Sequence, residues 1–307
     1  MLHLPRSFRF LYIKFFFIFC LSPIFVFSQT LSYKGLERTY RLHIPQNYHA
    51  GKAVPLVVIL HGGGGNAERM GRFTGFDHFS DRDTFIAVYP QAWKKHWNDG
   101  RDLDKYDAQK DRVDDVGFIS ALIDTLQKKY TIADKKIYVT GLSNGGMMTF
   151  RLGCELGARF AAIAPVIASM PRNLMEQRKP PDPVSVLIIN GTDDPLMPYG
   201  GGQVKLGKQE LGEVVSTEES FRFWCKNNAC TTDSVYSQIP DSDTGDGCAT
   251  TRVVFSCPGQ TEVVLYTIHG GGHNMPGCMQ YLPRSIIGNT SHDFSGADVI
   301  WGFFKQH

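Results

Sequence analysis

The chain has 307 residues, of which 42% are hydrophobic, 20% charged and 12% aromatic. A chain of this length can bury a large core, and this balance is ordinary for a globular protein and argues against disorder. The formal net charge is only +2. Such a small charge favours neither nucleic acid nor an anionic membrane as a partner.

Residues 1–28 have the pattern of a secretory signal peptide. A basic start precedes an apolar stretch over 15–27, and Ser28 provides a cleavage point. We therefore predict export to the periplasm or the extracellular space, and a mature domain over 29–307. Cleavage would remove three basic residues and no acidic one, so the formal charge would change from +2 to −1.

Two alternatives for this segment are less favoured. A retained membrane anchor would need roughly 20 uninterrupted apolar residues, whereas this stretch is shorter and Pro23 interrupts it. A lipoprotein signal would need a small residue before the cysteine, and Phe19 before Cys20 is too bulky. No membrane contact is expected once the signal is removed.

Whether the cysteines are expected to form disulfides also depends on export. Six remain in the mature domain, and an even number in an oxidising compartment predicts disulfides. Four of them fall between Cys225 and Cys257, so this region is expected to be crosslinked, whereas Cys154 is either a buried thiol or a partner of Cys278. A zinc site is not favoured, because the sequence has no CxxC pair. The six are Cys154, Cys225, Cys230, Cys248, Cys257 and Cys278.

From Thr39 onward, short apolar runs alternate with longer amphipathic segments. The runs are rich in valine and isoleucine and are bounded by turn residues, which is typical of buried strands. This alternation predicts parallel β-α-β units, and therefore an α/β fold with a mostly parallel sheet. The runs are PLVVIL (55–60), FIAVYP (85–90), KIYVT (136–140), AAIAP (161–165) and VSVLIIN (184–190).

Helices are predicted between these runs, over 116–130 and 145–160, where apolar residues recur at helical spacing. Another helix is predicted to begin at Ser216, because Ser216 and Glu219 stand in capping-box relation. The sequence shows no internal repeat and no long linker, so we expect one domain. Its remaining segments are strands over 251–257 and 262–268, a polar loop over 239–247 and a closing helix over 295–307.

The stretch YVTGLSNGGMM, 138–148, places Ser143 between glycines, directly after a predicted strand and before a predicted helix. Glycines on both sides allow a sharp strand-to-helix turn on which a serine points outward as a nucleophile. The start of the following helix then favours negative charge that develops at the reacting centre. Ser143 is therefore a candidate catalytic residue.

A serine nucleophile needs a base and a residue that orients the base. His273 lies in a glycine-rich loop after the last strand and is favoured over His269; a metal-binding pair is not favoured, because the glycines between them oppose a helix. The acid is expected from the loop after 184–190, which contains Asp193 and Asp194. Both could also be simple turn residues. The order Ser143, Asp194, His273 is the one expected for α/β-hydrolases.

Negative charge on the substrate oxygen must also be stabilised. The run LHGGGGN, 60–66, follows a strand, and its glycine amides can approach a substrate without obstruction. We expect the amides of Gly63 and Asn144 to form a two-donor oxyanion hole. A phosphate-binding loop is the alternative, but no lysine follows in the required position.

With these residues identified, the chain resembles the secreted polyhydroxybutyrate depolymerase and feruloyl esterase group of α/β-hydrolases, which also contains acetylxylan esterases. The resemblance rests on segments that span nearly the whole mature chain in order. It implies an α/β-hydrolase fold in a single domain. The segments are LHGGGGN, YPQAW, WNDGR, VDDVGFISALID, YVTGLSNGGMMTFRLGCE, RFAAIAPV, NGTDDPLMPY, GGGHNMPG and DVIWGFF.

The resemblance implies Ser143 as nucleophile, Asp194 as acid and His273 as base. It also implies that WNDGR and the adjacent Asp114 and Asp115 lie near the site. For these two carboxylates, however, we favour a structural role, in which their hydrogen bonds fix the loop and the next helix. Members of the group commonly carry tryptophan where this chain has Met275. That departure affects the aromatic contacts expected around the substrate.

The expected activity is that of a secreted serine esterase that works through an acyl-enzyme, without metal or organic cofactor. Its expected substrate is a small ester or an acylated polysaccharide, with hydroxycinnamoyl esters of plant polysaccharide preferred. Poly(3-hydroxybutyrate) or other short acyl esters, including acetylxylan, are the alternative. Trp93, Trp97 and Tyr199 could form an aromatic wall, or belong to the core or the rim.

Two other classes of function fit the sequence less well. A binding module that has lost catalysis would show damage to the triad, and Ser143, Asp194 and His273 are all present. A serine peptidase on the same scaffold would usually carry an additional propeller or a larger cap, for which this chain has no room.

Overall fold

The computed structural model describes residues 28–307. The predicted signal peptide lies outside the described residues except for Ser28, so it remains an expectation. None of the helices in the described part is both long enough and apolar enough to cross a membrane.

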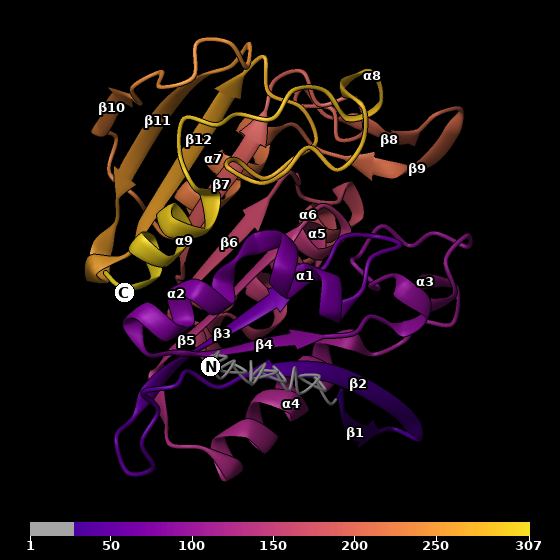
Figure 1. The fold of residues 1–307 in the computed structure, drawn as a ribbon. Coiled ribbons are helices and arrows are strands. Elements are labelled where there is room, and N and C mark those ends of the chain that lie inside the picture. Colours follow the sequence, from indigo (N-terminus) through magenta and orange to yellow (C-terminus); the bar gives the residue numbers. More distant parts are fainter. Residues whose placement is uncertain (1–27) are drawn as a thin grey trace, which may run out of the picture.

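A ten-stranded sheet forms the centre of the molecule (Figure 1). The six middle strands are parallel, and antiparallel strands extend both edges. In spatial order the strands are β1 (Gln29–Tyr33), β2 (Leu36–His43), β4 (Ile86–Pro90), β3 (Val54–Leu60), β5 (Ile132–Leu142), β6 (Ala162–Val166), β7 (Ser185–Gly191), β12 (Glu262–His269), β11 (Ala249–Ser256) and β10 (Ser234–Gln238).

The predicted apolar runs all form strands of this sheet. In β3, Leu56 and Val58 face one core cluster, whereas Val57 and Ile59 face the other. A strand buried on both faces has no polar alternation, which is why these runs are continuously apolar. The sequence did not reveal β1, β2 or β10, whose side chains are largely half-buried or exposed.

Helices cover both faces of the sheet (Figure 1). One face packs against α4, α5 and α7, and the other against α1, α2 and α9. Their bounds, with those of the shorter helices, are α1 (Ala67–Thr74), α2 (Phe76–Asp83), α3 (Asp107–Lys110), α4 (Asp115–Lys129), α5 (Asn144–Leu156), α6 (Arg172–Gln177), α7 (Thr217–Asn227), α8 (Arg284–Ile287) and α9 (Gly296–Phe304). The described part also contains three short 3₁₀ turns, which are η1 (Trp93–Lys95), η2 (Gly157–Arg159) and η3 (Pro258–Gln260).

Local sequence signals account for several of these boundaries. The capping box predicted at Ser216 is present: its hydroxyl accepts from the Glu219 amide, and the Glu219 carboxylate accepts from the Ser216 amide. The polar segment 239–247 is a loop between β10 and β11, as predicted. A separate hairpin of β8 (Gly202–Leu206) and β9 (Gln209–Val214) was not predicted from the sequence.

One disulfide, between Cys230 and Cys257, crosslinks the region in which the sequence predicted it. Its sequence separation is 27 residues, and it ties the end of α7 to the end of β11. The remaining described cysteines are free, so the alternative of a bridge between Cys154 and Cys278 is wrong. Cys154 is instead a buried thiol in α5, and burial raises its pKa to about 12.

The two adjacent carboxylates 114 and 115 have the structural roles favoured from the sequence. Asp114 caps α4, because its side chain accepts from the Gly117 amide at 2.9 Å. Asp115 is fully buried, pairs with the buried Arg38 at 2.7 Å and accepts from the Asn98 amide at 2.8 Å. Burial raises the pKa of Asp115, and the Arg38 guanidinium opposes that rise.

This buried pair gives the first prediction. Replacement of Arg38 by leucine leaves Asp115 buried without its partner, and removal of one member of such a pair typically costs about 3–5 kcal/mol. We expect a loss of that size in the free energy of unfolding, measured in urea. Arg72→Leu is the control: the Arg72 side chain is 74% exposed beside Glu68, so its loss should stay within about 1 kcal/mol. Equal small losses in the two variants would contradict the prediction.

Candidate active site

The candidate residues come together at one edge of the sheet. β3, β5, β7 and β12 are parallel, so their carboxyl ends point the same way and the loops that follow them are neighbours. Figure 1 shows the segment after β12 and the β8–β9 hairpin lying beyond these strand ends. A cavity of about 770 Å³ opens there, and Ser143, His273, Gly63 and Asn144 all line it.

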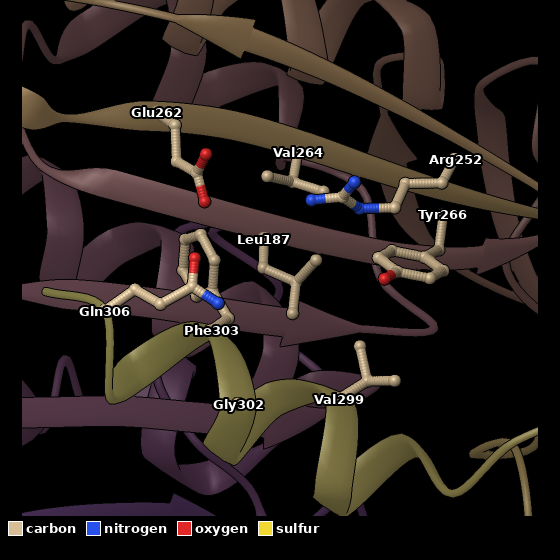
Figure 2. A pocket seen from close by; sticks show the side chains of 9 residues that line it. All are labelled: Leu187, Arg252, Glu262, Val264, Tyr266, Val299, Gly302, Phe303 and Gln306. Carbon is tan, nitrogen blue, oxygen red and sulfur yellow. The ribbon is translucent and has the colours of Figure 1, made fainter. Parts of the chain in front are cut away.

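A second and smaller cavity lies elsewhere and contains none of these residues. It measures about 220 Å³ and lies between α9 and strands β7, β11 and β12. Figure 2 shows Arg252 and Glu262 above an apolar floor that includes Leu187 and Phe303. The residues singled out from the sequence therefore belong to the larger cavity.

Ser143 occupies the sharp turn that the sequence predicted between β5 and α5. Its φ and ψ are 55° and −117°, a region that non-glycine residues rarely occupy. The turn is possible because Gly141 and Gly145 pack closely: a Cβ on Gly141 would lie 2.4 Å from the Gly145 carbonyl oxygen, and one on Gly145 would lie 2.5 Å from the Leu60 carbonyl oxygen. The two glycines of the motif are thus required by close backbone contact.

His273 and Asp194 form a buried pair. Nδ1 of His273 lies 2.6 Å from Oδ2 of Asp194, and both side chains are almost completely buried. The other carboxylate oxygen of Asp194 accepts from the amides of Leu196 and Met197, both at 2.8 Å. A carboxylate at Nδ1 fixes the tautomer with hydrogen on Nδ1, which leaves Nε2 free to accept a proton.

The rival residues are in different surroundings. His269 is exposed at the end of β12 and lies 3.1 Å from the Thr251 hydroxyl. Asp193 is exposed and accepts from the Thr192 hydroxyl. Within residues 28–307, no three His, Cys, Asp or Glu side chains are arranged to hold a metal ion. His273 is thus the histidine that is hydrogen-bonded to Asp194, and it lines the same cavity as Ser143.

The loop after β3 brings backbone amides to the same cavity. The amides of Gly64 and Gly65 donate to the carbonyls of Lys95 and Gly62, whereas that of Gly63 donates to no group in the described part of the chain. A Cβ on Gly63 would lie 3.1 Å from the His96 ring and 3.6 Å from Cβ of Asn144. The Gly63 backbone therefore lies beside Asn144 in a narrow space.

His61 holds the start of this loop and was not identified from the sequence. Its Nδ1 lies 2.8 Å from the Gly62 carbonyl, and its Nε2 accepts from the Ala92 amide at 3.1 Å. The indole of the fully buried Trp97 donates to the His61 carbonyl at 2.9 Å. Burial lowers the pKa of His61 to about 4, which agrees with a neutral imidazole that accepts at Nε2.

Asn144 was predicted from the sequence for its backbone amide, but the hydrogen bonds that constrain its side chain were not predicted. Its Oδ1 accepts from the Trp97 amide at 2.8 Å, and its Nδ2 donates to Asp99 Oδ2 at 2.5 Å and to the Trp97 carbonyl at 3.2 Å. Asp99 is paired in turn with Arg101. The sequence motif WNDGR, 97–101, thus lies next to the site, as the resemblance implied, but through contacts with Asn144.

The walls of the cavity differ from the expected aromatic set. Trp93, Trp97 and Tyr199 do not line it: Trp97 is a core residue, and the Tyr199 hydroxyl bonds to that of Thr267 at 2.9 Å. Met275, which stands where tryptophan was expected, is buried and does not line it either. The lining aromatic side chains are instead Phe73, Tyr106 and Tyr281, with His96 stacked on Tyr106 at a ring distance of 3.8 Å.

Several known proteins are similar to this chain in sequence. The family described as Esterase PHB depolymerase matches residues 38–169. "Putative esterase NocK" of Nocardia uniformis subsp. tsuyamanensis is 32% identical over 278 residues, which cover 88% of this chain and 79% of that protein. "Feruloyl esterase B" of Piromyces equi is 30% identical over 163 residues, which cover 52% of this chain but only 29% of that longer protein.

Among solved structures, an acetyl xylan esterase from Aspergillus awamori resembles this chain with a TM-score of 0.55. The alignment covers 88% of this chain and 94% of that one, at 13% sequence identity, so it bears on the fold alone. It confirms the α/β-hydrolase fold that the resemblance implied.

The family match includes the loop after β3, the segment 97–101 and Ser143. The similarity to NocK extends over most of the described domain. The chain therefore belongs to the Esterase PHB depolymerase family and is a carboxylic ester hydrolase.

Proposed function

We propose that the protein is a secreted serine esterase in which Ser143 is the nucleophile, His273 the base and Asp194 the residue that orients the base. The observation that carries this proposal is the buried hydrogen bond between His273 Nδ1 and Asp194 Oδ2 at the wall of the cavity that Ser143 also lines. A serine hydroxyl is a weak nucleophile alone and needs such a base.

The reaction follows two steps. The Ser143 oxygen attacks the ester carbonyl carbon while His273 Nε2 takes the hydroxyl proton, and collapse of the tetrahedral intermediate releases the alcohol with that proton. Water then attacks the acyl-enzyme by the same route and releases the acid and free Ser143. In both steps Asp194 stabilises the imidazolium, and the Gly63 and Asn144 amides donate to the oxygen that becomes negative.

The preferred substrate is a hydroxycinnamoyl ester of plant polysaccharide. The cavity of about 770 Å³ has room for an aromatic acyl group. Two of its lining residues, the half-buried Phe73 and the exposed Tyr281, pack edge to face with ring centroids 5.8 Å apart. The fungal relative with 30% identity is named a feruloyl esterase. Short 3-hydroxybutyrate or acetyl esters are the alternative substrates.

Turnover of methyl ferulate tests both the mechanism and the substrate. We use protein expressed with its complete N-terminal segment and purified from an oxidising compartment. Ser143→Ala should lower kcat/KM by about 10⁵- to 10⁶-fold, because the nucleophile is removed. If the protein cleaves a 3-hydroxybutyrate oligomer but not methyl ferulate, the alternative substrate is the correct one. If Ser143→Ala is as active as the wild type, the mechanism is ruled out.

Phe73 tests the acyl side of the cavity. Loss of an aromatic contact is worth about 0.5–1.5 kcal/mol, so Phe73→Ala should raise KM for methyl ferulate by about 3- to 10-fold. We expect KM for methyl acetate to change less than about twofold, because this ester has no aromatic group for the ring to contact. Phe79→Ala is the control, since Phe79 is also partly buried but does not line the cavity. Equal effects on both esters would assign Phe73 no part in acyl selection.

His61 makes the stability of the oxyanion loop dependent on pH. Its pKa falls from the ordinary 6.5 to about 4 in the folded protein, so the unfolded chain binds the extra proton first. The contribution of His61 to the stability of the folded state is therefore fully present above pH 6.5, and this contribution is lost as the pH falls toward 4. This lowering of the His61 pKa corresponds to about 3 kcal/mol.

Urea unfolding of the wild type and of His61→Gln between pH 4 and pH 7 measures this effect. We expect the wild type to lose about 3 kcal/mol more than the variant over this range, because the variant lacks the titrating group. Other titrating groups contribute equally to both curves and cancel in the difference. Parallel curves would show that His61 is not held neutral by the fold.

A further inference from the structure

The peptide between Ser143 and Asn144 sets the geometry of the proposed oxyanion hole. Ser143 has φ 55° and ψ −117°, and such a conformation costs roughly 1–3 kcal/mol unless the surrounding structure holds it. Rotation about ψ of Ser143 turns the Asn144 N–H. Relaxation of this strain would therefore turn the proposed donor away from the substrate oxygen, so some contact must resist it.

The Met147 amide donates to the carbonyl of this peptide at 2.8 Å, and the Asn144 side chain provides a second restraint. The Trp97 backbone holds the amide at both ends, with 2.8 Å to its oxygen and 3.2 Å to its nitrogen, and Asp99 accepts a second hydrogen bond from the nitrogen. Asn144 is 3% exposed and Asp99 is fully buried, so water does not compete for these bonds. A side chain held at both ends fixes the position of its own Cα, and with it the preceding peptide.

Asp99 is itself held rigidly. The Arg101 guanidinium contacts both of its carboxylate oxygens, the shortest distance being 2.7 Å, and Gln109 donates to it at 3.0 Å. Arg101 also donates to the Leu211 carbonyl in β9 at 2.6 Å. The guanidinium is therefore anchored at a second point, and the Asp99 carboxylate is oriented toward Asn144.

We propose that Asp99 is a positioning residue for the oxyanion hole. Through the Asn144 side chain it helps to keep Ser143 in its positive-φ conformation and directs the Asn144 N–H at the reacting oxygen. Asp99 does not line the cavity, so it acts through Asn144 and exchanges no proton with the substrate. The inference rests on the proposed function, in which the Asn144 amide is one of the two oxyanion donors.

Asp115 provides a matched control. It is as completely buried as Asp99, pairs with an arginine at the same 2.7 Å and accepts from the Asn98 amide in the same loop. Among the described residues, however, no hydrogen bond joins Asp115 to Asn144. Asp115→Asn therefore reports the general effect of weakening a buried ion pair here, whereas Asp99→Asn also disturbs the Asn144 contact.

The experiment compares the full-length wild type with Ser143→Ala, Asp99→Asn, Asn144→Ala and Asp115→Asn. For each protein we measure kcat and KM with p-nitrophenyl acetate, and Ki for an alkyl trifluoromethyl ketone, whose adduct with the serine carries an oxyanion. All assays run well below the melting temperature of the least stable variant. Asn144→Ala keeps the backbone donor and removes only the anchoring side chain.

We expect Asp99→Asn and Asn144→Ala each to lower kcat by about 10- to 100-fold, somewhat less than complete loss of one oxyanion donor. KM should stay within about threefold, and Ki should rise by the factor by which kcat/KM falls. A double variant that combines Asp99→Asn with Asn144→Ala, measured in the same way, should lose about as much as the more severe single one, because both changes act through one contact. Asp115→Asn should keep kcat within about threefold of the wild type.

Other outcomes would overturn the proposal. Equal losses of kcat in Asp99→Asn and Asp115→Asn, additive losses in the double variant or an unchanged Ki would leave Asp99 a purely structural role. If Asp99→Asn does not fold, Asn144→Ala decides, and normal kcat in that variant rejects the inference. An inactive wild type, or equal activity in Ser143→Ala, would instead refute the proposed function and is recognised before the other variants are compared.

Discussion

The positive-φ backbone conformation of Ser143 is the constraint on which the rest of the site depends. A strand that enters a helix through a single residue must turn sharply, and that turn exposes the serine side chain and the first amides of the helix to the same space. The packing around Gly141 and Gly145 leaves no room for larger side chains. The site is therefore built where two backbones approach so closely that only glycine fits, and the strain at Ser143 is balanced by contacts around it.

The parallel sheet explains why the other groups reach this turn. His273 follows β12, Asp194 follows β7 and the glycine loop follows β3, and these strands are parallel to β5. Parallel strands in one sheet deliver all of their carboxyl ends to one edge, so residues up to 210 positions apart in the chain become neighbours without any special folding of the loops. Short loops then suffice, and their amides are held by contacts within a few residues of the strand ends.

The sequence predicted the parts of this arrangement that have local patterns. Buried strands are continuously apolar, and Ser143 lies in a motif with a strand before it and a helix after it, so both could be recognised. The hydrogen bonds of Asn144 to Trp97 and Asp99 join segments more than 40 residues apart and leave no periodicity in the chain. The β8–β9 hairpin was missed because its residues are mostly exposed, polar or glycine. Tryptophans 93 and 97 were considered for the substrate wall because bulk alone does not say which side of a loop faces the cavity.

Two buried ion pairs restrain the short loop at residues 97–101: Arg101 with Asp99 lies within it, and Asp115, paired with Arg38, accepts from its Asn98 amide. Burial of charge is expensive, and such pairs commonly stabilise a fold less than apolar residues of the same size would. Their directional bonds, however, restrict a loop in a way that apolar contacts do not, because each carboxylate accepts from a particular backbone or side-chain donor. A loop that must hold both His61 and Asn144 needs this restriction more than it needs stability, since displacement by a fraction of an ångström weakens an oxyanion donor. The charges of the Asp99 pair are therefore better explained by the geometry that the proposed reaction requires, because Asp99 contacts Asn144, whereas the Asp115 pair fixes the loop and the start of α4.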